Sequence, residues 1–269
     1  MARNFASRRL LAVGVLGAVL FAVCASGCAT ITEGRNIAAR AAYWRPQLNG
    51  DTSLGSSATR GSKLDIDDVF ELGDEEAILL AADLRWRAVG LDVSYFELSE
   101  DGNTLLNETI SYNGQTYSSG VTLDSSTDLS LATAHLRWGW LGFGPICIGP
   151  KFGADYLDTE TRLSASGIST RKVKEDVFPV AGAFATFDMG VIGDRLRVVA
   201  DLDFTGFTGH FDHTRGDFID LNARVGVQAE FVALGVGYRH VDIELEQSRR
   251  NLDTDLELSG PMLYFELAF

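Results

Sequence analysis

Two histidine-containing stretches hold residue types that could carry out hydrolysis. In Gly209-His210-Phe211-Asp212-His213, an aspartate lies between two imidazoles. A carboxylate that orients an imidazole can help it to activate water as a general base. Peptide hydrolysis at such a site also needs a second acidic partner, and no paired aspartate stands at a defined spacing from this stretch. A catalytic site is therefore the less favoured interpretation of these residues.

A second candidate group is His240, Asp242 and Glu244, which alternate along the chain. Alternate residues of a strand share one face, so the three side chains are expected together. A His-x-Ser spacing would add a nucleophile, but Asp242 stands at that position and Ser248 lies in an expected loop. We interpret this group as a solvated rim. No zinc-type spacing, phosphate-binding loop or dinucleotide fingerprint occurs, so we expect no metal site and no cofactor.

The elements that must position these residues are strands with strict two-residue alternation. Over residues 217–231 every odd position from Ile219 to Phe231 is apolar, while the even positions carry Asp220, Arg224 and other polar side chains. Successive side chains of a strand point to opposite faces. The same pattern recurs over the stretches 78–87, 195–205 and 263–269. One face of the sheet is therefore predicted to be apolar and the other charged.

The alternating stretches are long, at roughly ten to fifteen residues, whereas strands of soluble proteins average ~5–6 and membrane-crossing strands need ~9–11. Their connections alternate between short turns and long polar segments, as in outer-membrane barrels. The long connections are expected over residues 49–76, 100–120, 159–172, 209–215 and 247–254. The sequence predicts an all-β, antiparallel up-and-down transmembrane barrel of about ten strands, over residues 37–48, 77–88, 90–99, 121–139, 144–158, 173–188, 194–208, 216–231, 233–246 and 255–269.

Two stretches leave alternatives open. Within 233–246 the apolar set changes phase between Tyr238 and Val241, which predicts a bulge near Arg239 to Val241 or a strand end standing above the lipid. A further strand between residues 104 and 112 would make the strand count odd. With an even count both termini lie at one end of the barrel, which export would place in the periplasm.

The C-terminal stretch resembles a known assembly signal. In Met262-Leu263-Tyr264-Phe265-Glu266-Leu267-Ala268-Phe269, aromatic and apolar residues alternate up to a final phenylalanine. This resembles the C-terminal signal of outer-membrane barrels, carried here by Tyr264, Phe265, Leu267 and Phe269. The stretch 233–240 is similar to late strands of OmpA-like barrels. The resemblance implies a Gram-negative outer membrane, insertion by the barrel-assembly machinery and surroundings of lipid and lipopolysaccharide. It implies no activity or oligomeric state.

Two enzyme families on small barrels bear on the histidines. Omptins are ten-stranded barrels that hydrolyse peptides with Asp and His residues at the outer rim, which is where the stretch 209–213 is expected. Lipid A deacylases use a His-Ser-acid set, which His240 would match only with a serine at the position of Asp242. Either resemblance would make the chain an outer-rim hydrolase, which remains the second alternative function.

The N-terminal residues are typical of an export signal. Arg3, Arg8 and Arg9 precede the apolar run from Leu10 to Val23, and small residues follow. This layout predicts a signal peptide over residues 1–28 and a barrel over residues 29–269, with a short membrane anchor as the alternative. Ala25-Ser26-Gly27-Cys28 resembles a bacterial lipobox, which implies a lipid on Cys28; ordinary cleavage beside Ala25 or Ala29 is the alternative. Lipidation would leave only Cys147, expected as a packing residue.

The charges predict a role for the barrel interior. The formal net charge of -14 argues against nucleic-acid binding. Acidic and basic residues on the inward face are nearly balanced, and buried charges must be paired or hydrated. We therefore expect a structural or surface-interaction barrel with a charge-filled narrow lumen, and a small diffusion pore as the first alternative. The expected lumen residues are Asp83, Arg85, Arg87, Asp92, His135, Arg137, Lys151, Asp155, Asp188, Arg195, Arg197, Asp201, Asp203, Asp220, Arg224, Glu230, Arg239 and Glu266.

Overall fold

The computed structural model describes residues 37–54, 62–65, 76–86, 88–192, 195–211, 214–247 and 252–269. Residues 1–28, which include the expected signal peptide and Cys28, lie outside the described residues. Arg87, Asp212 and His213 lie outside them as well. No helix within the described ranges is long and apolar enough to cross a membrane.

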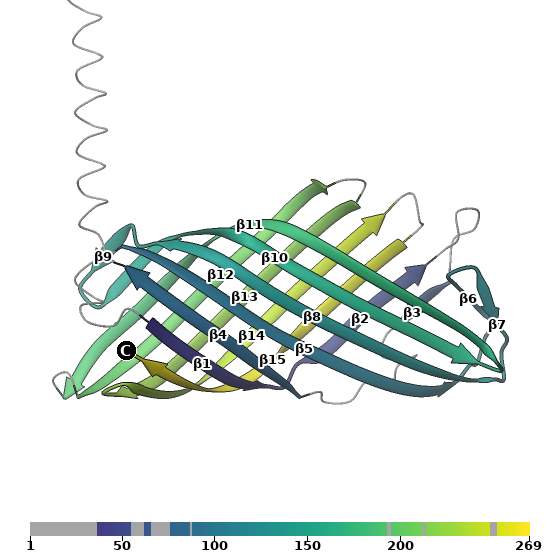
Figure 1. Ribbon diagram of the computed structural model, residues 1–269, viewed down its shortest axis with the longest axis horizontal. Helices are drawn as coiled ribbons and strands as arrows, with labels where there is room; N and C mark the ends of the chain where they lie inside the picture. The colour runs from purple at the N-terminus through teal and green to yellow at the C-terminus, as the bar shows by residue number, and fades with distance from the viewer. Residues whose placement is uncertain are drawn as a thin grey trace, which may run out of the picture.

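Ten antiparallel strands form a closed barrel, as the alternating sequence predicts (Figure 1). Each strand pairs with its neighbour along the chain, and β1 pairs with β15 to close the wall. The wall strands are β1 (Ile37–Trp44), β4 (Ala77–Trp86), β5 (Val89–Leu105), β8 (Thr122–Trp138), β10 (Ile146–Ala165), β11 (Ile168–Ile192), β12 (Leu196–Phe211), β13 (Thr214–Ala229), β14 (Val232–Gln247) and β15 (Leu252–Ala268).

The remaining strands are short additions to this wall. β2 (Gln47–Leu54) continues the line of β1 along β15, and β3 (Lys63–Asp65) pairs with β2. β9 (Leu141–Phe143) pairs with the first residues of β10. β6 (Ile110–Tyr112) and β7 (Gln115–Tyr117) form a separate hairpin, so residues 104–112 add no strand to the wall.

The barrel closes where its first and last strands meet. The backbone amide of Phe269 donates to the carbonyl of Ile37 at 2.8 Å, and the amide of Ile37 donates back to Phe269 at 3.2 Å. The start of β1 and the end of β15 therefore lie at one end of the barrel, here called the terminal end. The opposite end, here called the distal end, carries the β6–β7 hairpin (Figure 1).

Two expected long distal loops are strand instead. β10 and β11 continue to a two-residue turn at Ser166 and Gly167, whose φ angles of 51° and 81° suit a tight hairpin. β12 and β13 stay paired up to Phe211 and Thr214. Most of the expected loop 159–172, and the described residues of 209–215, thus belong to strands that extend beyond the apolar wall. Their polar composition resembles that of a loop.

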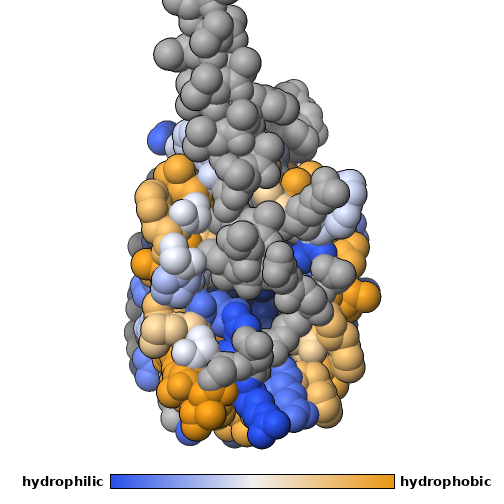
Figure 2. Space-filling view, turned by 90° about the vertical axis from the view of Figure 1, so that its left-hand side faces the viewer, coloured by the Kyte–Doolittle hydropathy of each residue, from blue (hydrophilic) through white to orange (hydrophobic). Residues whose placement is uncertain are grey.

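Large apolar side chains cover the outer surface near the terminal end. Viewed from that end, orange apolar residues surround a blue opening (Figure 2). The apolar stretch ends on four strands at an exposed tyrosine, and the next residue on the outer face is Arg45, Glu97, Asp158 or His240. We call the outer surface below these tyrosines the belt. Its exposed aromatic residues include Tyr43, Tyr95, Tyr156 and Tyr238 at the distal side and Trp86, Trp138, Phe143, Phe231 and Phe269 at the terminal side.

Inside the barrel, polarity changes along the axis in the opposite direction to that of the outer surface. Inward residues below the tyrosines are largely charged, whereas most inward residues on the distal side are apolar and almost fully buried, with Glu100 and Ser125 as polar exceptions. The pairing of β14 with β13 and with β15 runs without a shift through Arg239 to Val241, so no bulge is present there. The second interpretation, a strand that continues above the belt, fits the register. We call the buried distal set the distal core; it includes Phe96, Leu98, Leu129, Leu131, Leu157, Phe178, Phe218, Val241, Ile243, Leu256 and Leu258.

The β6–β7 hairpin covers the distal core. Its turn residues Asn113 and Gly114 have φ angles of 49° and 77°, which this tight reversal requires. Its face carries Ile110, Tyr112 and Tyr117, all buried in the core cluster. The Tyr117 hydroxyl shares a hydrogen bond of 2.7 Å with the Thr170 hydroxyl. The hairpin is therefore fastened to the barrel wall at the distal end.

Candidate functional site

The charged lumen is the candidate site, and strand alternation places it. In β13 the inward positions include Asp220 and Arg224, while the alternating outward positions carry Leu221, Ala223 and Val225. Neighbouring strands contribute their own inward positions in the same way, because paired residues share a face. Charges from strands that are not neighbours thus meet across the narrow interior.

Asp203 lies at the centre of the network. Arg137 donates a short hydrogen bond to its carboxylate, and the Lys151 ammonium lies 3.2 Å from it. The guanidinium of Arg224 lies 3.7 Å away. Asp92 lies 3.3 Å from the same lysine and 3.5 Å from Arg137. These groups are at least four-fifths buried, so each charge is compensated by neighbours in place of bulk water.

Arg40 joins the network, although the sequence did not single it out. Its guanidinium lies 2.9 Å from Asp83 and 2.7 Å from Glu266, linking β1 to both neighbouring strands. The even positions Ala38, Arg40, Ala42 and Trp44 all point inward. Alanines occupy both faces of this strand, so its inward and outward positions differ little in polarity and the sequence pattern does not distinguish them.

A second group lies toward the distal core. His135 Nε2 lies 2.7 Å from Asp155, and its Nδ1 lies 3.7 Å from Asp92. Arg239 donates two hydrogen bonds to Asp220, at 3.1 and 2.7 Å.

The Arg239 guanidinium also closes the polar region. It stacks 5.0 Å from the ring centre of Phe96 and 5.7 Å from that of Trp44. The two rings pack edge to face with centres 5.0 Å apart. The charged lumen therefore ends at an aromatic layer.

Among the described residues, the interior histidine is hydrogen-bonded to a carboxylate and not to a hydroxyl group. The hydroxyls of Ser94 and Thr133 hydrogen-bond each other at 2.8 Å. In the described part of the chain the hydrogen-bond partner of His135 is Asp155. Asp155 therefore orients the imidazole, and the two hydroxyl groups are bonded to each other.

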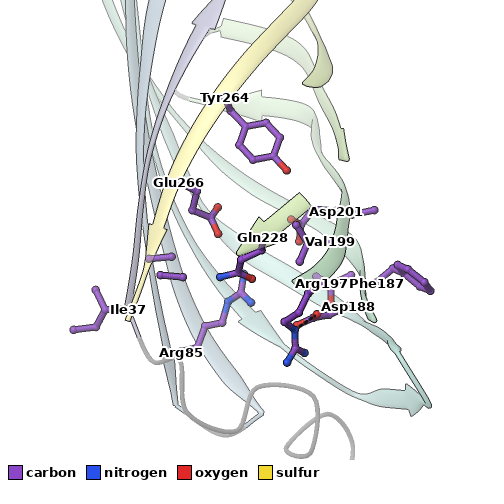
Figure 3. A pocket seen from close by; sticks show the side chains of 14 residues that line it. Ile37, Arg85, Phe187, Asp188, Arg197, Val199, Asp201, Gln228, Tyr264 and Glu266 are labelled. Atoms are coloured by element: carbon purple, nitrogen blue, oxygen red, sulfur yellow. Dashed lines mark hydrogen bonds and ion pairs between the residues drawn. The ribbon is translucent and has the colours of Figure 1, made fainter. Parts of the chain in front are cut away.

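The lumen opens into a cavity of about 70 Å³ at the terminal end (Figure 3). Arg85 from β4, Gln228 from β13, and Tyr264 and Glu266 from β15 line it, with Asp201 from β12 opposite. Asp201 lies 3.4 Å from Arg224, which joins this cavity to the central network. At the rim, Arg197 donates to Asp188 at 2.6 Å.

Three expected lumen residues are not placed in the lumen. Arg195 and Glu230 lie exposed in the turns before β12 and after β13, where the alternation no longer applies. Glu230 has a φ angle of 53°, and its amide donates to the Arg195 carbonyl at 3.3 Å. The third, Arg87, falls outside the described residues. Extending two-residue parity past the strand ends produced the first two assignments.

Of the two histidine stretches, the one that the structure describes in full does not face this lumen. His240, Asp242 and Glu244 face outward above the belt, and His240 Nδ1 lies 3.4 Å from Glu257. Partial burial, together with Asp255, Asp242 and Asp217, raises the pKa of Glu244. His210 belongs to β12, but its side chain lies outside the described residues, as do Asp212 and His213.

Cys147 and the residues of the expected C-terminal assembly signal have defined places in the barrel wall. Cys147 is buried beside Phe184, where the sequence predicts a packing residue. Tyr264 points inward, whereas Phe265 and Phe269 are exposed on the outer face. Phe269 stacks on Phe231 with ring centres 6.4 Å apart. The expected assembly signal thus lies on the closing strand, and its role stays a prediction.

No protein-family model and no curated protein matches this sequence. Among solved structures, the outer membrane protease OmpT from Escherichia coli is 8% identical, with a TM-score of 0.58, covering 87% of this chain and 97% of that one. The transport unit of the autotransporter AIDA-I from Escherichia coli is 10% identical, with a TM-score of 0.43, covering 94% and 98%. The translocator domain of the autotransporter NalP from Neisseria meningitidis is 10% identical, with a TM-score of 0.39, covering 100% of both. The likeness to OmpT shows that the chain has an outer-membrane β-barrel fold.

Proposed function

We propose that this chain is an outer-membrane barrel with a structural or surface-interaction role and a lumen closed to diffusion. The observation that carries this proposal is the interior, in which paired charges give way to an apolar core. Trp44, Phe96 and Leu131 within it are completely buried. A diffusion pore would need a continuous aqueous path, and this packing supports none.

The belt supports placement in a membrane. Leu202 and Val225 lie on it, each about half exposed, and an apolar outer surface of this extent is stabilised by lipid. Aromatic residues at its two edges fit the membrane–water interfaces. In this proposal the terminal end is periplasmic, the distal end faces outward, and lipopolysaccharide surrounds the distal edge of the belt.

Export and assembly complete the proposal. The signal peptide over residues 1–28 would be removed during export, and the C-terminal strand ending at Phe269 would be read by the barrel-assembly machinery. A lipid on Cys28 would add a periplasmic anchor close to the start of β1. Globomycin tests this last part: precursor accumulation supports lipidation, and normal processing in its presence excludes it.

Planar bilayers test the closed lumen directly. Purified folded protein should give no stepwise conductance, while a Gram-negative general porin serves as the positive control. Reproducible single-channel steps from heat-modifiable protein would overturn the proposal in favour of the diffusion pore. The distal surface can be tested separately by deleting β6–β7 and measuring whole-cell surface adhesion, with outer-membrane abundance measured alongside.

A rim hydrolase remains the second alternative, since the likeness to OmpT concerns the fold. Asp242 and Glu244 stand together on the outer face near His240, without a serine in the triplet. A peptidase and lipid A deacylase assay on outer-membrane vesicles tests this alternative. Loss of activity in one of the variants His240→Ala and His210→Ala, with activity kept in the other, would identify which stretch is responsible.

A further inference from the structure

We propose that the charged lumen is a hydrated vestibule, in which water enters from the terminal end, binds Arg224, Arg239 and Asn222, and stops at a seal formed by Trp44 and Phe96. The proposed function requires only that the lumen be closed. This inference deepens it by naming the small ligand, water, and the layer that stops it.

The first support is a cavity of about 40 Å³ inside the charged lumen. Arg224 and Arg239 line it and are more than nine-tenths buried. The Nε and Nη1 atoms of Arg224 and the Nη1 atom of Arg239 have no hydrogen-bond partner in the described protein. The Oδ1 atom of Asn222, another residue that lines the cavity, also has no hydrogen-bond partner in the described protein.

Buried donors and acceptors of this kind need partners. Leaving one unsatisfied costs about 1–3 kcal/mol, and more for charged groups. A buried water molecule typically makes about three hydrogen bonds and needs roughly 10–15 Å³ of cavity of this kind. The lumen cavity is therefore large enough for two or three water molecules, about as many as its donors and acceptors require.

A monoatomic anion fits this cavity less well than water. Arg40 and Lys151 line it beside the two arginines, but so do four carboxylates, those of Asp83, Asp92, Asp203 and Asp220. The carboxylates compensate most of the positive charge, so the site offers hydrogen bonds without a large net field. Water can both donate and accept at such a site, which matches Arg224 on one side and Asn222 on the other.

The second support is continuity with the terminal cavity. Glu266 lines the terminal cavity and contacts Arg40, which lines the inner one. Asp201 and Arg224 make the same connection on another side. Two ion pairs thus separate the cavities, and water can exchange past them when their side chains fluctuate.

The third support is the abrupt end of polar surface. Arg239 packs against Phe96 and Trp44, and the next inward layer contains Leu131, Val241 and Leu258, all completely buried. Leu131 lies opposite Phe96 in the β5–β8 pairing. An apolar packed layer offers water no hydrogen bonds, so the path ends there.

Silver-ion access to single cysteines tests the vestibule in detergent micelles. Val199→Cys probes the terminal cavity, Ser94→Cys the inner cavity and Leu131→Cys the seal, in a chain that carries Cys24→Ala, Cys28→Ala and Cys147→Ala. Leu202→Cys is the matched control on the belt. Free thiols are counted after unfolding, and only variants that keep the heat shift on gels are compared. Thr133→Cys replaces Ser94→Cys if the latter does not fold.

Both vestibule cysteines should react, and Leu131→Cys should react about 100-fold more slowly than Ser94→Cys because silver must wait for the packed layer to open. Equal inertness at Ser94→Cys and Leu131→Cys would overturn the hydrated cavity. Equal reactivity at those two positions would overturn the seal. The assay needs no membrane, so a failure of outer-membrane localisation would appear in fractionation and not in this result.

Discussion

Tyr238 and Val241 lie three residues apart on β14, yet Tyr238 is 49% exposed on the outer face and Val241 is 0% exposed inside the barrel. The strand keeps its register between them, so their opposite directions follow from ordinary alternation. What changes is the surroundings. Below this level apolar residues face outward and charges face inward, and above it the arrangement is reversed. A single set of strands therefore forms a lipid-compatible wall and, beyond it, a water-compatible one.

The belt predicts strong sensitivity to charge on the outer face below the tyrosines. Leu202→Arg and Val225→Arg should each lower the free energy of unfolding in lipid vesicles by ~2–4 kcal/mol, because both side chains would meet hydrocarbon. Glu246→Arg, which lies outward above Tyr238, is the matched control and should change it by less than ~0.5 kcal/mol. Urea titration followed by tryptophan fluorescence measures all three. Equal effects at the three positions would contradict a lipid boundary at the tyrosines.

The paired charges in the lumen predict that removing one member of an ion pair lowers the free energy of unfolding more than removing both members. Arg239→Leu leaves Asp220 buried beside its lost partner and should cost ~3–5 kcal/mol of unfolding free energy. Adding Asp220→Leu should recover a large part of that loss, because no uncompensated charge then remains. A double-mutant cycle in urea measures the coupling. Additive losses from the two substitutions would show that the ion pair at 2.7 Å does not act as a unit.

Two carboxylates above the belt predict opposite pH effects on stability. Hydrogen bonds from Arg171 and Arg162 lower the pKa of Glu160 below its ordinary value of 4.5. Its stabilisation is therefore present above pH 4.5 and is lost as the pH falls through the lowered pKa. Glu244 has a raised pKa, from partial burial and neighbouring acids, so its folded form becomes less favourable as the pH rises.

The opposite pKa shifts of Glu160 and Glu244 can be tested with one glutamine variant of each. At pH 7 Glu160→Gln should lower the midpoint of thermal unfolding and Glu244→Gln should raise it; both differences should shrink toward pH 3. Added salt should reduce both effects, since the groups are at the surface. Heat-modifiability gels over a temperature series provide the midpoints. A stabilising Glu160→Gln, or a destabilising Glu244→Gln at neutral pH, would contradict the assigned electrostatics.

The distal hairpin predicts a graded response at Tyr117. Tyr117→Phe removes the hydroxyl that contacts Thr170 and should cost ~0.5–1.5 kcal/mol. Tyr117→Ala also removes the ring from the distal core and should cost ~3–5 kcal/mol. Proteolysis at the β6–β7 turn should become faster in the same order. Unchanged protease resistance in Tyr117→Ala would show that this side chain does not fasten the hairpin.

Much of the wall could be predicted from sequence because alternation is a local property. The stretch from Ile219 to Phe231 gives the inner and outer faces of β13 by parity alone. Parity fails only where the strand ends, which explains the assignment of Arg195 and Glu230 to the lumen. Alternation also cannot distinguish a polar strand in water from a loop. For that reason the sequence predicts polar connections where β10 to β13 continue distally.

The partners within the lumen were beyond the reach of sequence. Asp203 meets Arg137 and Lys151 because strands that are not direct neighbours in the wall bring their inward side chains together in a narrow interior. Nothing local in the chain encodes which charges meet. The phase change between Tyr238 and Val241 was visible, but choosing between a bulge and a strand above the lipid required the register of β14 with both neighbours.

Fractionation of cells that export the chain, followed by gels with and without boiling, tests the membrane barrel most directly. We predict a band in the outer-membrane fraction that migrates differently after boiling, as a folded closed barrel does. A soluble periplasmic band without a heat shift would contradict the account, because the apolar belt around Leu202 and Val225 would then have to be covered by something other than lipid.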